Sequence, residues 1–309
     1  MRVFVAGASG AIGRPLLPRL VAAGHEVTGM TRSPATTDEI RAVGAHAAVA
    51  DVFDRDALHG VLAEAAPEAV IHELTALPRR FNPRDKGLYD ATNRVRTEGT
   101  RNLIDAARAA GARRLLCQSI AFAYRPPERP AVLDEAAPLF LDAPAPFADA
   151  CRAVAEMERM VLEAEGLVLR YGWFYGPGTY YAADGSTAED VRRRRFPVIG
   201  SGAGLFSFIH VDDAAAATVA AVERGASGIY NVVDDEPAPM REWLPAYAEA
   251  IGAKPPRRAP VWLARLIAGR FVAQMATRLP GASNAKAKRE LEWTPGRPSW
   301  REGFRGAAD

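Results

Sequence analysis

The chain of 309 residues has too few cysteines, too little net charge and too little continuous apolar sequence for several classes of protein. Its two cysteines, Cys117 and Cys151, cannot form a disulfide framework or a metal-ligand cluster, which is typical of a reducing compartment and predicts no metal site. No run of about 18 apolar residues occurs, so we expect no membrane span. The net charge of +2 gives no overall bias toward nucleic acid or an anionic membrane. Met1-Arg2 leads directly into the strand-like Val3–Ala6 without a signal peptide, so we expect a cytoplasmic protein.

Lysine is also scarce, because only four of the 39 basic residues are lysines. The positions four residues before Lys86, Lys254, Lys286 and Lys288 hold Asn82, Ala250, Ala282 and Asn284, respectively. Residues four apart share one face of a helix. The sequence therefore contains no tyrosine and lysine at the spacing of one helical turn.

Short apolar runs alternate with amphipathic segments in the first half of the chain, which predicts a parallel sheet with helices on both faces. From Gly172 the rhythm changes to a stretch rich in Gly, Pro and Tyr. We expect a doubly wound α/β domain, a Rossmann fold, from residues 1–171 and 206–235. We expect residues 172–205 and 236–309 to form a smaller substrate-binding lobe, which closes over the carboxyl ends of the strands. The expected strands are Val3–Ala6, Glu26–Met30, Ala47–Ala50, Ala69–His72, Arg114–Gln118, Leu167–Tyr171 and Ile229–Val233, and the expected helices include Ile12–Ala23, Asp54–Ala66, Tyr89–Ala110, Asp149–Glu165 and Ala214–Arg224.

A glycine motif joins the first expected strand to the first expected helix, in the sequence Gly7-Ala8-Ser9-Gly10-Ala11-Ile12-Gly13. In such motifs the first glycine permits a tight turn, the second lets the backbone approach a pyrophosphate, and the third lets helix and strand pack closely. The pyrophosphate then lies at the positive end of the helix. The motif predicts a nicotinamide dinucleotide as cofactor.

The end of the second strand carries Thr31-Arg32-Ser33, where a dinucleotide-binding unit contacts the adenosine ribose. An acidic residue there favours NAD, whereas an arginine accommodates the 2′-phosphate of NADP. Arg32 therefore favours NADP, with NAD still open, because an exposed arginine can also stack on adenine without binding a phosphate.

Several further motifs, in the same order along nearly the whole chain, resemble the extended short-chain dehydrogenases/reductases, in their NAD-dependent epimerase/dehydratase branch. Asp51-Val52 is similar to the family's adenine-contacting pair, and Leu74-Thr75-Ala76 is similar to the end of its fourth strand. Asn93 with Gly99-Thr100-Arg101-Asn102-Leu103 resembles its helix signature, and Leu169–Gly178 resembles the segment that passes the nicotinamide. The glycine motif and this resemblance together assign the following residues to the cofactor: Gly7, Ser9, Gly10, Ala11, Ile12, Gly13, Thr31, Arg32, Ser33, Asp51, Val52, Leu74, Thr75, Ala76, Asn93, Gln118, Tyr171, Trp173 and Phe174.

The resemblance implies catalysis by a Tyr-x-x-x-Lys pair and a Ser or Thr after the fifth strand, and the chain departs from that pattern. Ala150 and Val154 stand at the pair's positions, and Ile120 stands where the hydroxyl is expected, one residue after Ser119. A tyrosine without a cationic partner has a pKa near 10, roughly, so it is a poor base at neutral pH. Reduction needs only hydride, stabilisation of the oxyanion and a proton from water or a phenol. The candidate hydroxyls are Ser119, Tyr124, Tyr175 and Tyr181, although each tyrosine can equally be a pocket wall.

These observations favour an NADPH-dependent reductase of a small, apolar carbonyl or enone. Two alternatives remain, a nucleotide-sugar epimerase or dehydratase and a non-catalytic NAD(P)-binding sensor or scaffold. Four other features each have a structural and a functional interpretation. Glu73 is a buried acid or a polar contact, and His210 is a general acid or a hydrogen-bonded strand end. Arg192–Arg195 form a phosphate site or a solvated helix end, and Ala259–Met275 form lobe core, a pocket wall or a dimer surface. We expect a small-molecule substrate, no nucleic-acid or membrane partner, and a possible homodimer.

Overall fold

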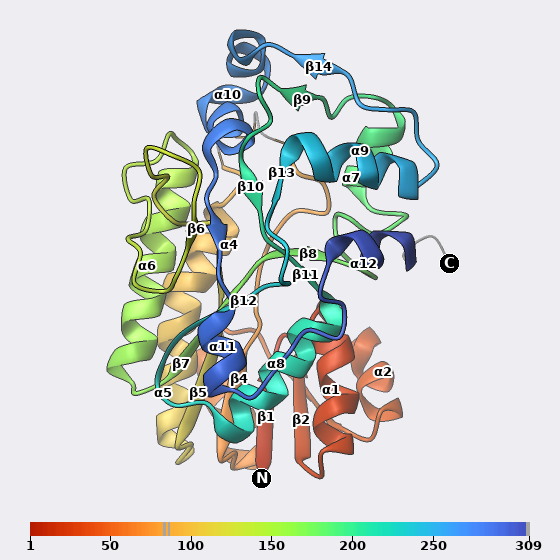
Figure 1. Cartoon of the computed structure of the whole chain (residues 1–309). Coiled ribbons are helices and arrows are strands. Elements are labelled where there is room, and N and C mark those ends of the chain that lie inside the picture. Colours follow the sequence, from red (N-terminus) through yellow and green to blue (C-terminus); the bar gives the residue numbers. More distant parts are fainter. Residues whose placement is uncertain (83–84, 86, 307–309) are drawn as a thin grey trace.

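A computed structural model describes residues 1–82, 85 and 87–306. Seven parallel strands form the central sheet, in the order β12-β7-β5-β4-β1-β2-β3 (Figure 1). This confirms the predicted doubly wound fold, in which the strand order reverses between β1 and β4 and leaves a ligand crevice at the carboxyl ends. The strands are β1 (Arg2–Ala6), β2 (Glu26–Thr31), β3 (His46–Val49), β4 (Ala69–His72), β5 (Arg114–Ile120), β7 (Leu167–Tyr171) and β12 (Gly228–Val232).

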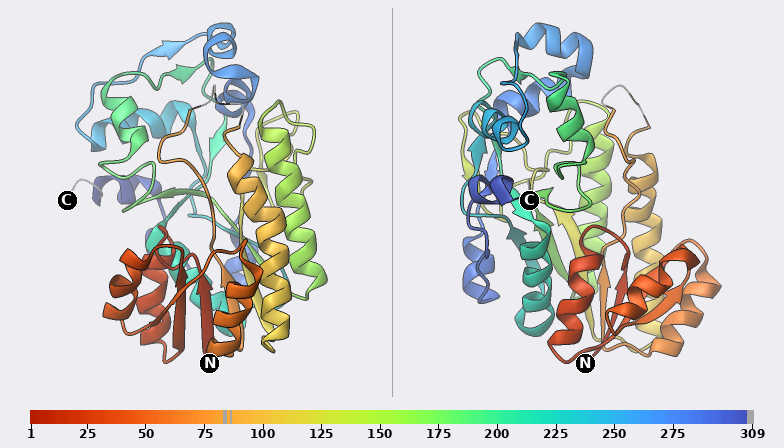
Figure 2. Two further views of the ribbon diagram at one scale, coloured as in Figure 1. Left: turned by 180° about the vertical axis from the view of Figure 1, so that it is seen from behind. Right: turned by 90° about the vertical axis from the view of Figure 1, so that its right-hand side faces the viewer.

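Helices cover both faces of the sheet, as Figure 2 shows from two further sides. On one face Val3 and Val5 of β1 pack in a core with α1 (Gly13–Ala22), α8 (Val211–Arg224) and α11 (Ala285–Glu290). On the other face Phe4 and Ala6 pack with α3 (Arg55–Ala65) and α5 (Thr100–Ala109). Side chains alternate between the faces of a strand, so an apolar run buries both of them. The short α2 (Thr37–Ala42), preceded by a 3₁₀ turn at Pro34–Thr36, joins β2 to β3.

One long helical segment was expected over Tyr89–Ala110, and the structure divides it into three parts. They are α4 (Asp90–Arg94), a π-helical turn (Val95–Gly99) and α5. The segment packs beside α6 (Phe147–Glu163), the helix that leads to β7. A π turn changes the direction in which the side chains point, and such turns are frequent at functional sites.

The smaller lobe lies above the carboxyl ends of the strands and has a separate aromatic core around Trp243 (Figure 1). Its boundaries differ from the expected ones in two places. Phe206 and Phe208 pack in the lobe core, whereas Leu291 and Trp293 return to the core of the sheet. Its elements are β8 (Trp173–Tyr175), α7 (Ser186–Arg192), β9 (Val198–Ile199), β10 (Leu205–Phe206), β11 (Phe208–His210), β13 (Ala238–Pro239), α9 (Met240–Ala250), β14 (Arg258–Ala259), α10 (Val261–Arg278) and α12 (Trp300–Gly306), and a two-stranded pair of β6 (Val132–Leu133) and β15 (Gly281–Ala282) lies beside it.

Helix α10 bends at Gly269, which has a φ of 91°. Before the bend, Trp262 and Leu266 are 67% and 79% exposed. After the bend, Phe271 is buried and stacks on Phe147 of α6, with ring centroids 4.0 Å apart. None of the helices in the described part of the chain is long and apolar enough to cross a membrane.

Candidate active site

The glycine loop is the tightest turn of the crevice, and two of its glycines have no room for a side chain. Gly7 has a φ of 99°, and a Cβ atom there would lie 2.7 Å from the carbonyl oxygen of Glu73. A Cβ atom on Gly13 would lie 2.3 Å from the carbonyl oxygen of Gly7. Gly10 is exposed and donates its N–H to the Gly7 carbonyl at 3.0 Å. The three glycines therefore hold the loop against the end of β4 and bring α1 close to β1.

The loop presents free donors at the start of α1. No backbone carbonyl or side chain in the described part of the chain accepts a hydrogen bond from the N–H groups of Ala11 and Ile12. Ser9 Oγ lies 3.2 Å from Thr31 Oγ1, which fixes the loop to the end of β2. Free N–H groups at the positive end of a ten-residue helix fit the pyrophosphate of a dinucleotide.

A cavity of about 360 Å³ lies beside this loop, at the carboxyl ends of β2, β3 and β4. It brings together six residues that the sequence assigned to the cofactor, from three separate loops. Five further wall residues come from positions that the sequence analysis did not single out. The cavity is lined by Arg32, Asp51, Val52, Phe53, Leu74, Thr75, Ala76, Asp90, Ala91, Arg94 and Val95.

Two arginines flank this cavity in different ways. Arg32 is exposed and makes no hydrogen bond or ion pair with another described residue, so its guanidinium is free for a ligand. Arg94 is held by Glu98, with Nε 2.7 Å from Oε2, and its guanidinium lies 3.9 Å from the ring centroid of Phe53. The sequence offered one signal for Arg94, its place directly after Asn93, but an arginine on a helix is too common to single out.

Three predicted cofactor residues are buried or half-buried at the strand ends and helix next to the crevice. Gln118 at the end of β5 donates its amide to the carbonyl oxygen of Leu74 at 2.9 Å. Asn93 has a buried Oδ1 atom without a hydrogen-bond partner among the described residues. Thr31 is also buried, and its hydroxyl bonds Thr36 at 2.8 Å and accepts the N–H of Ser33.

The side chain of Tyr171 is enclosed by the sheet and its helices, and its assignment to the cofactor stays a prediction. It is fully buried among α1 and α8, and its hydroxyl lies 3.0 Å from Glu73 Oε1 and 2.6 Å from Thr218 Oγ1. Trp173 stacks on Phe122 at 4.0 Å, and Phe174 packs against Tyr171 at 5.2 Å, so both are anchored in aromatic clusters.

Ser119 and Tyr124, two of the four candidate hydroxyls, belong to one buried polar network rather than to an open site. Ser119 Oγ donates to Glu158 Oε1 at 2.6 Å, and both are at most 3% exposed. The same carboxylate forms a double contact with Arg170, at 2.8 and 2.6 Å. Arg170 also donates to the hydroxyl of Tyr124, which in turn donates to Asn231 at 2.7 Å. A structural role fits these groups, because every charge is paired and every hydroxyl is used.

Tyr175 and Tyr181, the other two candidates, lie in the lobe core. Tyr175 is fully buried against Phe208, His210 and Phe304, and its hydroxyl has no partner among the described residues. Tyr181 is 6% exposed and contacts Trp243 and Tyr247 edge to face. Burial raises the pKa of both phenols, so they stay neutral. The structure does not bring the four predicted hydroxyls together at one place.

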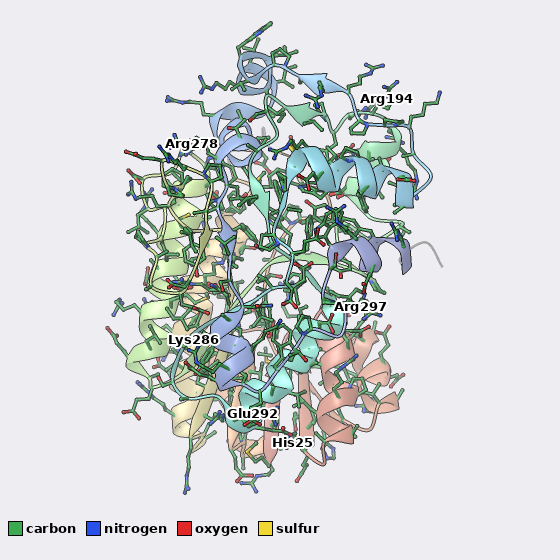
Figure 3. The ribbon with its side chains drawn as sticks, viewed as in Figure 1. His25, Arg194, Arg278, Lys286, Glu292 and Arg297 are labelled. Carbon is green, nitrogen blue, oxygen red and sulfur yellow. The ribbon has the colours of Figure 1, made fainter. Side chains whose placement is uncertain are left out.

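Lys286 and Lys288 are occupied elsewhere, Lys254 is exposed on the lobe, and Lys86 lies outside the described residues. Lys286 on α11 donates to the carbonyl of Ile229 at 2.8 Å, and Figure 3 shows it in front of the sheet. Lys288 pairs with Asp235 at 2.6 Å.

Two features with both a structural and a functional interpretation, His210 and Arg192–Arg195, have contacts that fit a structural role. The ring of His210 accepts the N–H of Asp212 at 3.1 Å and so caps α8. The four arginines at the end of α7 diverge: Arg192 bonds the carbonyl of Ala183, Arg193 pairs with Glu189 on its own helix, and Arg194 lies at the outer edge of the lobe (Figure 3).

Glu73 lies at the end of β4 beside Gly7, and the sequence left two interpretations for it, a buried acid or a polar contact. Its side chain is 7% exposed, Oε1 accepts from Tyr171, and Oε2 has no partner among the described residues. Burial raises the pKa of this carboxyl to about 8, and the hydrogen bond from Tyr171 opposes the shift. Glu73 is therefore a neutral acid at pH 7.

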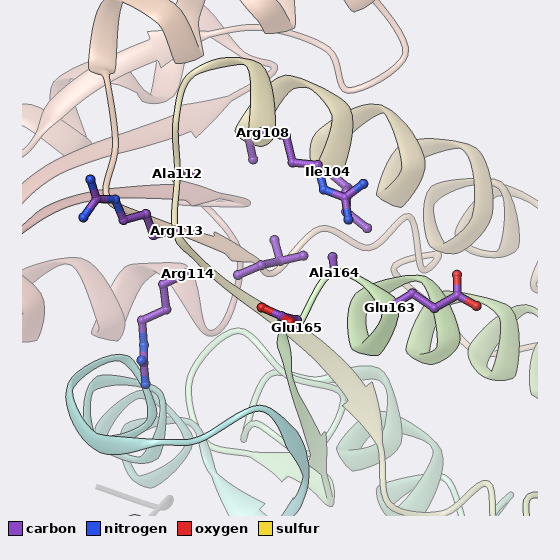
Figure 4. Close-up of a pocket in the computed structure, with 10 residues that line it drawn as sticks. Ile104, Arg108, Ala112, Arg113, Arg114, Glu163, Ala164 and Glu165 are labelled. Carbon is purple, nitrogen blue, oxygen red and sulfur yellow. The ribbon is translucent and has the colours of Figure 1, made fainter.

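A second cavity, of about 330 Å³, lies at the opposite end of the sheet (Figure 4). It is bordered by the start of β5 and by the ends of α5 and α6, with Arg108, Arg113, Arg114, Glu163 and Glu165 in its walls. In doubly wound sheets ligands bind at the carboxyl ends of strands, not at the amino ends. We therefore place the active site at the glycine loop.

The comparisons with known proteins identify the family of the chain. The model of the NAD dependent epimerase/dehydratase family matches residues 3–233. The chain is 51% identical over 307 residues, 98% of this chain and 99% of the relative, to a 3-diazoavenalumate denitrifying reductase of Streptomyces sp. It is 30% identical over 269 residues, 82% of this chain and 76% of the relative, to a 2-alkyl-3-oxoalkanoate reductase of Stenotrophomonas maltophilia (strain K279a).

The fold also matches the crystal structure of UDP-glucose 4-epimerase with UDP-glucose from Thermotoga maritima. The TM-score is 0.78 at 19% identity, with 99% of this chain and 97% of that chain covered. The glycine loop, the free donors of α1 and the match over residues 3–233 lead to one conclusion: the chain belongs to the NAD-dependent epimerase/dehydratase family and is an NAD(P)-dependent oxidoreductase, a reductase by its relatives.

Proposed function

We propose that this chain is an NADPH-dependent reductase that transfers hydride to the diazo group of a small aromatic carboxylate and releases N₂. The observation that carries this proposal is the burial of all four candidate hydroxyls, two of them in a hydrogen-bonded network and two in the lobe core, so that none of them is open to the crevice as a proton donor. The relative from Streptomyces, 51% identical over nearly the whole chain, supports the substrate class, because it is a denitrifying reductase of a diazo compound.

The chemistry of a diazonium group suits such a site. The group is a cation, so a hydride neutralises it without help from an acid. In the net reaction the carbon–nitrogen bond breaks, a carbon–hydrogen bond forms, NADPH is oxidised to NADP⁺ and N₂ leaves, with no net uptake of a proton. Reduction of a carbonyl, in contrast, consumes one proton, and a positioned general acid contributes about 10²- to 10⁴-fold to its rate.

The residues of the crevice have separate tasks in this proposal. The N–H groups of Ala11 and Ile12 bind the pyrophosphate, and the free guanidinium of Arg32 binds the 2′-phosphate, which supports NADPH over NADH. The bound dinucleotide supplies the hydride.

Carbonyl or enone reduction, which the sequence favours, is the second candidate function. The 30% identical relative from Stenotrophomonas supports it, because that protein is a reductase of an oxoalkanoate. The two candidates differ in what is released: only the diazo reaction forms N₂.

The test is to incubate the protein with NADPH and 3-diazoavenalumate, and to measure NADPH oxidised, N₂ released and the mass of the product. Diazonium compounds oxidise NADPH slowly by themselves, so the controls are the mixture without protein and the variant Gly10→Asp, whose carboxylate repels the pyrophosphate. We expect equal amounts of NADP⁺ and N₂, at a rate well above both controls.

Other outcomes identify the alternatives. NADPH oxidation with ketones or enones but not with the diazo compound would establish the carbonyl reductase. Interconversion of nucleotide sugars without net NADPH loss would establish the epimerase. Tight NADPH binding without turnover on any of these substrates would establish the sensor.

A further inference from the structure

Arg32 and Arg94 both line the cavity of about 360 Å³ beside the glycine loop, but their guanidinium groups are held in different ways. Arg32 makes no hydrogen bond or ion pair with another described residue, so all of its donors are available to a ligand. Arg94 ends α4 and is fixed on two sides, by the carboxylate of Glu98 and by the ring of Phe53. The two cations of this cavity therefore offer a ligand different groups.

Glu98 occupies the edge of the Arg94 guanidinium that an anion would need. It lies four residues further along, in the π-helical turn, where its Oε2 accepts from Nε at 2.7 Å and its Oε1 accepts from Nη2 at 3.0 Å. This two-point geometry is the one in which arginine binds a carboxylate or a phosphate group. Because Glu98 takes that edge and also cancels the charge, Arg94 is a poor ligand for a phosphate dianion.

Phe53 covers one face of the same guanidinium, whose central carbon lies 3.9 Å from the ring centroid. The backbone of Phe53 is itself fixed, because its N–H donates to Asp51 Oδ1 at 2.9 Å in the turn after β3. The side chain of Arg94 is nevertheless 57% exposed. A planar group whose edge and one face are occupied offers a ligand its other face.

The rest of the cavity fits a flat and largely apolar ring. Its volume of about 360 Å³ lies in the range of about 300–1,000 Å³ that small-molecule sites have. A guanidinium plane stacks on nucleobases as aromatic side chains do. The pyrophosphate site at α1 and the free Arg32 at the end of β2 together direct the adenine end of a dinucleotide into this cavity. The apolar residues of its wall are Val52, Phe53, Leu74, Ala76, Ala91 and Val95.

We propose that Arg94 is the stacking platform for the adenine ring of the cofactor, and that Arg32 alone selects the 2′-phosphate. Glu98 is a positioning residue, which holds the plane of Arg94 in place and keeps its edge from binding phosphate. The inference deepens the proposed function, on which it rests for the role of Arg32 but not for that of Arg94.

The test measures the binding of fragments of the cofactor, so it does not depend on turnover. The probes are AMP, adenosine 2′,5′-bisphosphate and nicotinamide mononucleotide, which has no adenine. Calorimetry is run on the full chain as wild type and as Arg94→Ala, Arg94→Lys, Glu98→Gln, Arg32→Ala and Arg159→Ala. Arg159 is the matched control, because it pairs with Glu163 four residues further along α6 at 2.7 Å, is 58% exposed and does not line the cavity.

We expect Arg94→Ala to weaken AMP and the bisphosphate by the same factor, about three- to thirtyfold, the range of one stacked cation, and to leave nicotinamide mononucleotide unchanged. Arg94→Lys keeps the charge but has no planar group, so it shows nearly the same loss. Glu98→Gln raises the preference for the bisphosphate over AMP, because it uncovers the charge of Arg94. Arg32→Ala weakens only the bisphosphate, and Arg159→Ala changes the binding of none of the probes.

Four results would overturn the inference. AMP binds equally well to the wild type and to Arg94→Ala; the loss in Arg94→Ala is confined to the bisphosphate, which would make Arg94 a phosphate ligand; Arg94→Lys binds AMP as the wild type does, which would show that the charge matters and the plane does not; or Arg94→Ala unfolds at a much lower temperature than Arg159→Ala, which would make Arg94 structural. An unchanged preference in Glu98→Gln would refute the role of Glu98. A wild type that binds AMP and the bisphosphate equally would refute the preference for NADPH in the proposed function and leave the role of Arg94 standing.

Discussion

Glu73 provides the sharpest test of the electrostatics of this fold. The carboxyl is 7% exposed, has one hydrogen bond from Tyr171, and has a pKa raised by burial to about 8 from an ordinary value of 4.5. The folded protein therefore holds a proton that the unfolded chain releases above about pH 4.5. The contribution of Glu73 to the free energy of unfolding is fully present at low pH. It is lost progressively as the pH rises from about 4.5 to about 8, and the free energy does not change further above pH 8 because of this group.

The magnitude follows from 1.36 kcal/mol for each pKa unit. At pH 7 the group lowers the free energy of unfolding by about 3 kcal/mol, and at pH 5 by under about 1 kcal/mol. Glu73→Gln keeps an acceptor for Tyr171 and abolishes the titration. We expect this variant to be more stable than the wild type at pH 7, by up to about 3 kcal/mol, and nearly equal to it at pH 5.

The assay is urea unfolding at a series of pH values between 5 and 8, with Glu64→Gln as the control, because Glu64 is exposed on α3. The difference between wild type and variant isolates Glu73 from other buried acids such as Asp234, whose pKa burial also raises. Parallel pH profiles for Glu73→Gln and the wild type would refute the reasoning.

Three further predictions concern the cofactor and the buried network. Arg32→Asp weakens the binding of NADPH about ten- to hundredfold and leaves the binding of NADH unchanged. The measurement is the ratio of the two dissociation constants, and an unchanged ratio would show that Arg32 does not bind the 2′-phosphate. Ser119→Ala lowers the free energy of unfolding by about 1–3 kcal/mol, because Glu158 loses a buried donor. It changes kcat far less than the loss of a general acid would, which is about 10²- to 10⁴-fold, and a fall in kcat of that size would show that Ser119 is catalytic. Arg170→Met destabilises by about 3–5 kcal/mol because Glu158 stays buried and charged, and Glu158→Leu in the same chain restores much of the loss; denaturant unfolding that shows no restoration would contradict the pairing.

The sequence by itself determined the sheet and the cofactor loop, because both depend on local rules. Apolar runs such as Val3–Ala6 and Leu167–Tyr171 become buried strands wherever helices cover both faces of a sheet. Gly7 and Gly13 stand where a Cβ atom would collide with backbone only a few residues away or in the next strand. A motif of this kind is readable because the constraint lies in the backbone.

The tertiary structure alone decided which polar groups are free for chemistry. Ser119 lies near the end of a strand and looks available in the sequence, but Glu158 on a helix 39 residues away accepts the hydrogen bond of its hydroxyl, and Arg170 on a strand 51 residues away holds that carboxylate. Tyr175 and Tyr181 enter the lobe core because aromatic residues from α9 and α12 close over them. Arg96 has no sequence signal at all, since an arginine on a helix is ordinarily solvated. Only the fold shows that Arg96 is 8% exposed and that its Nη1 atom has no hydrogen-bond partner among the described residues, because spacing along the chain does not contain the pairing of distant segments.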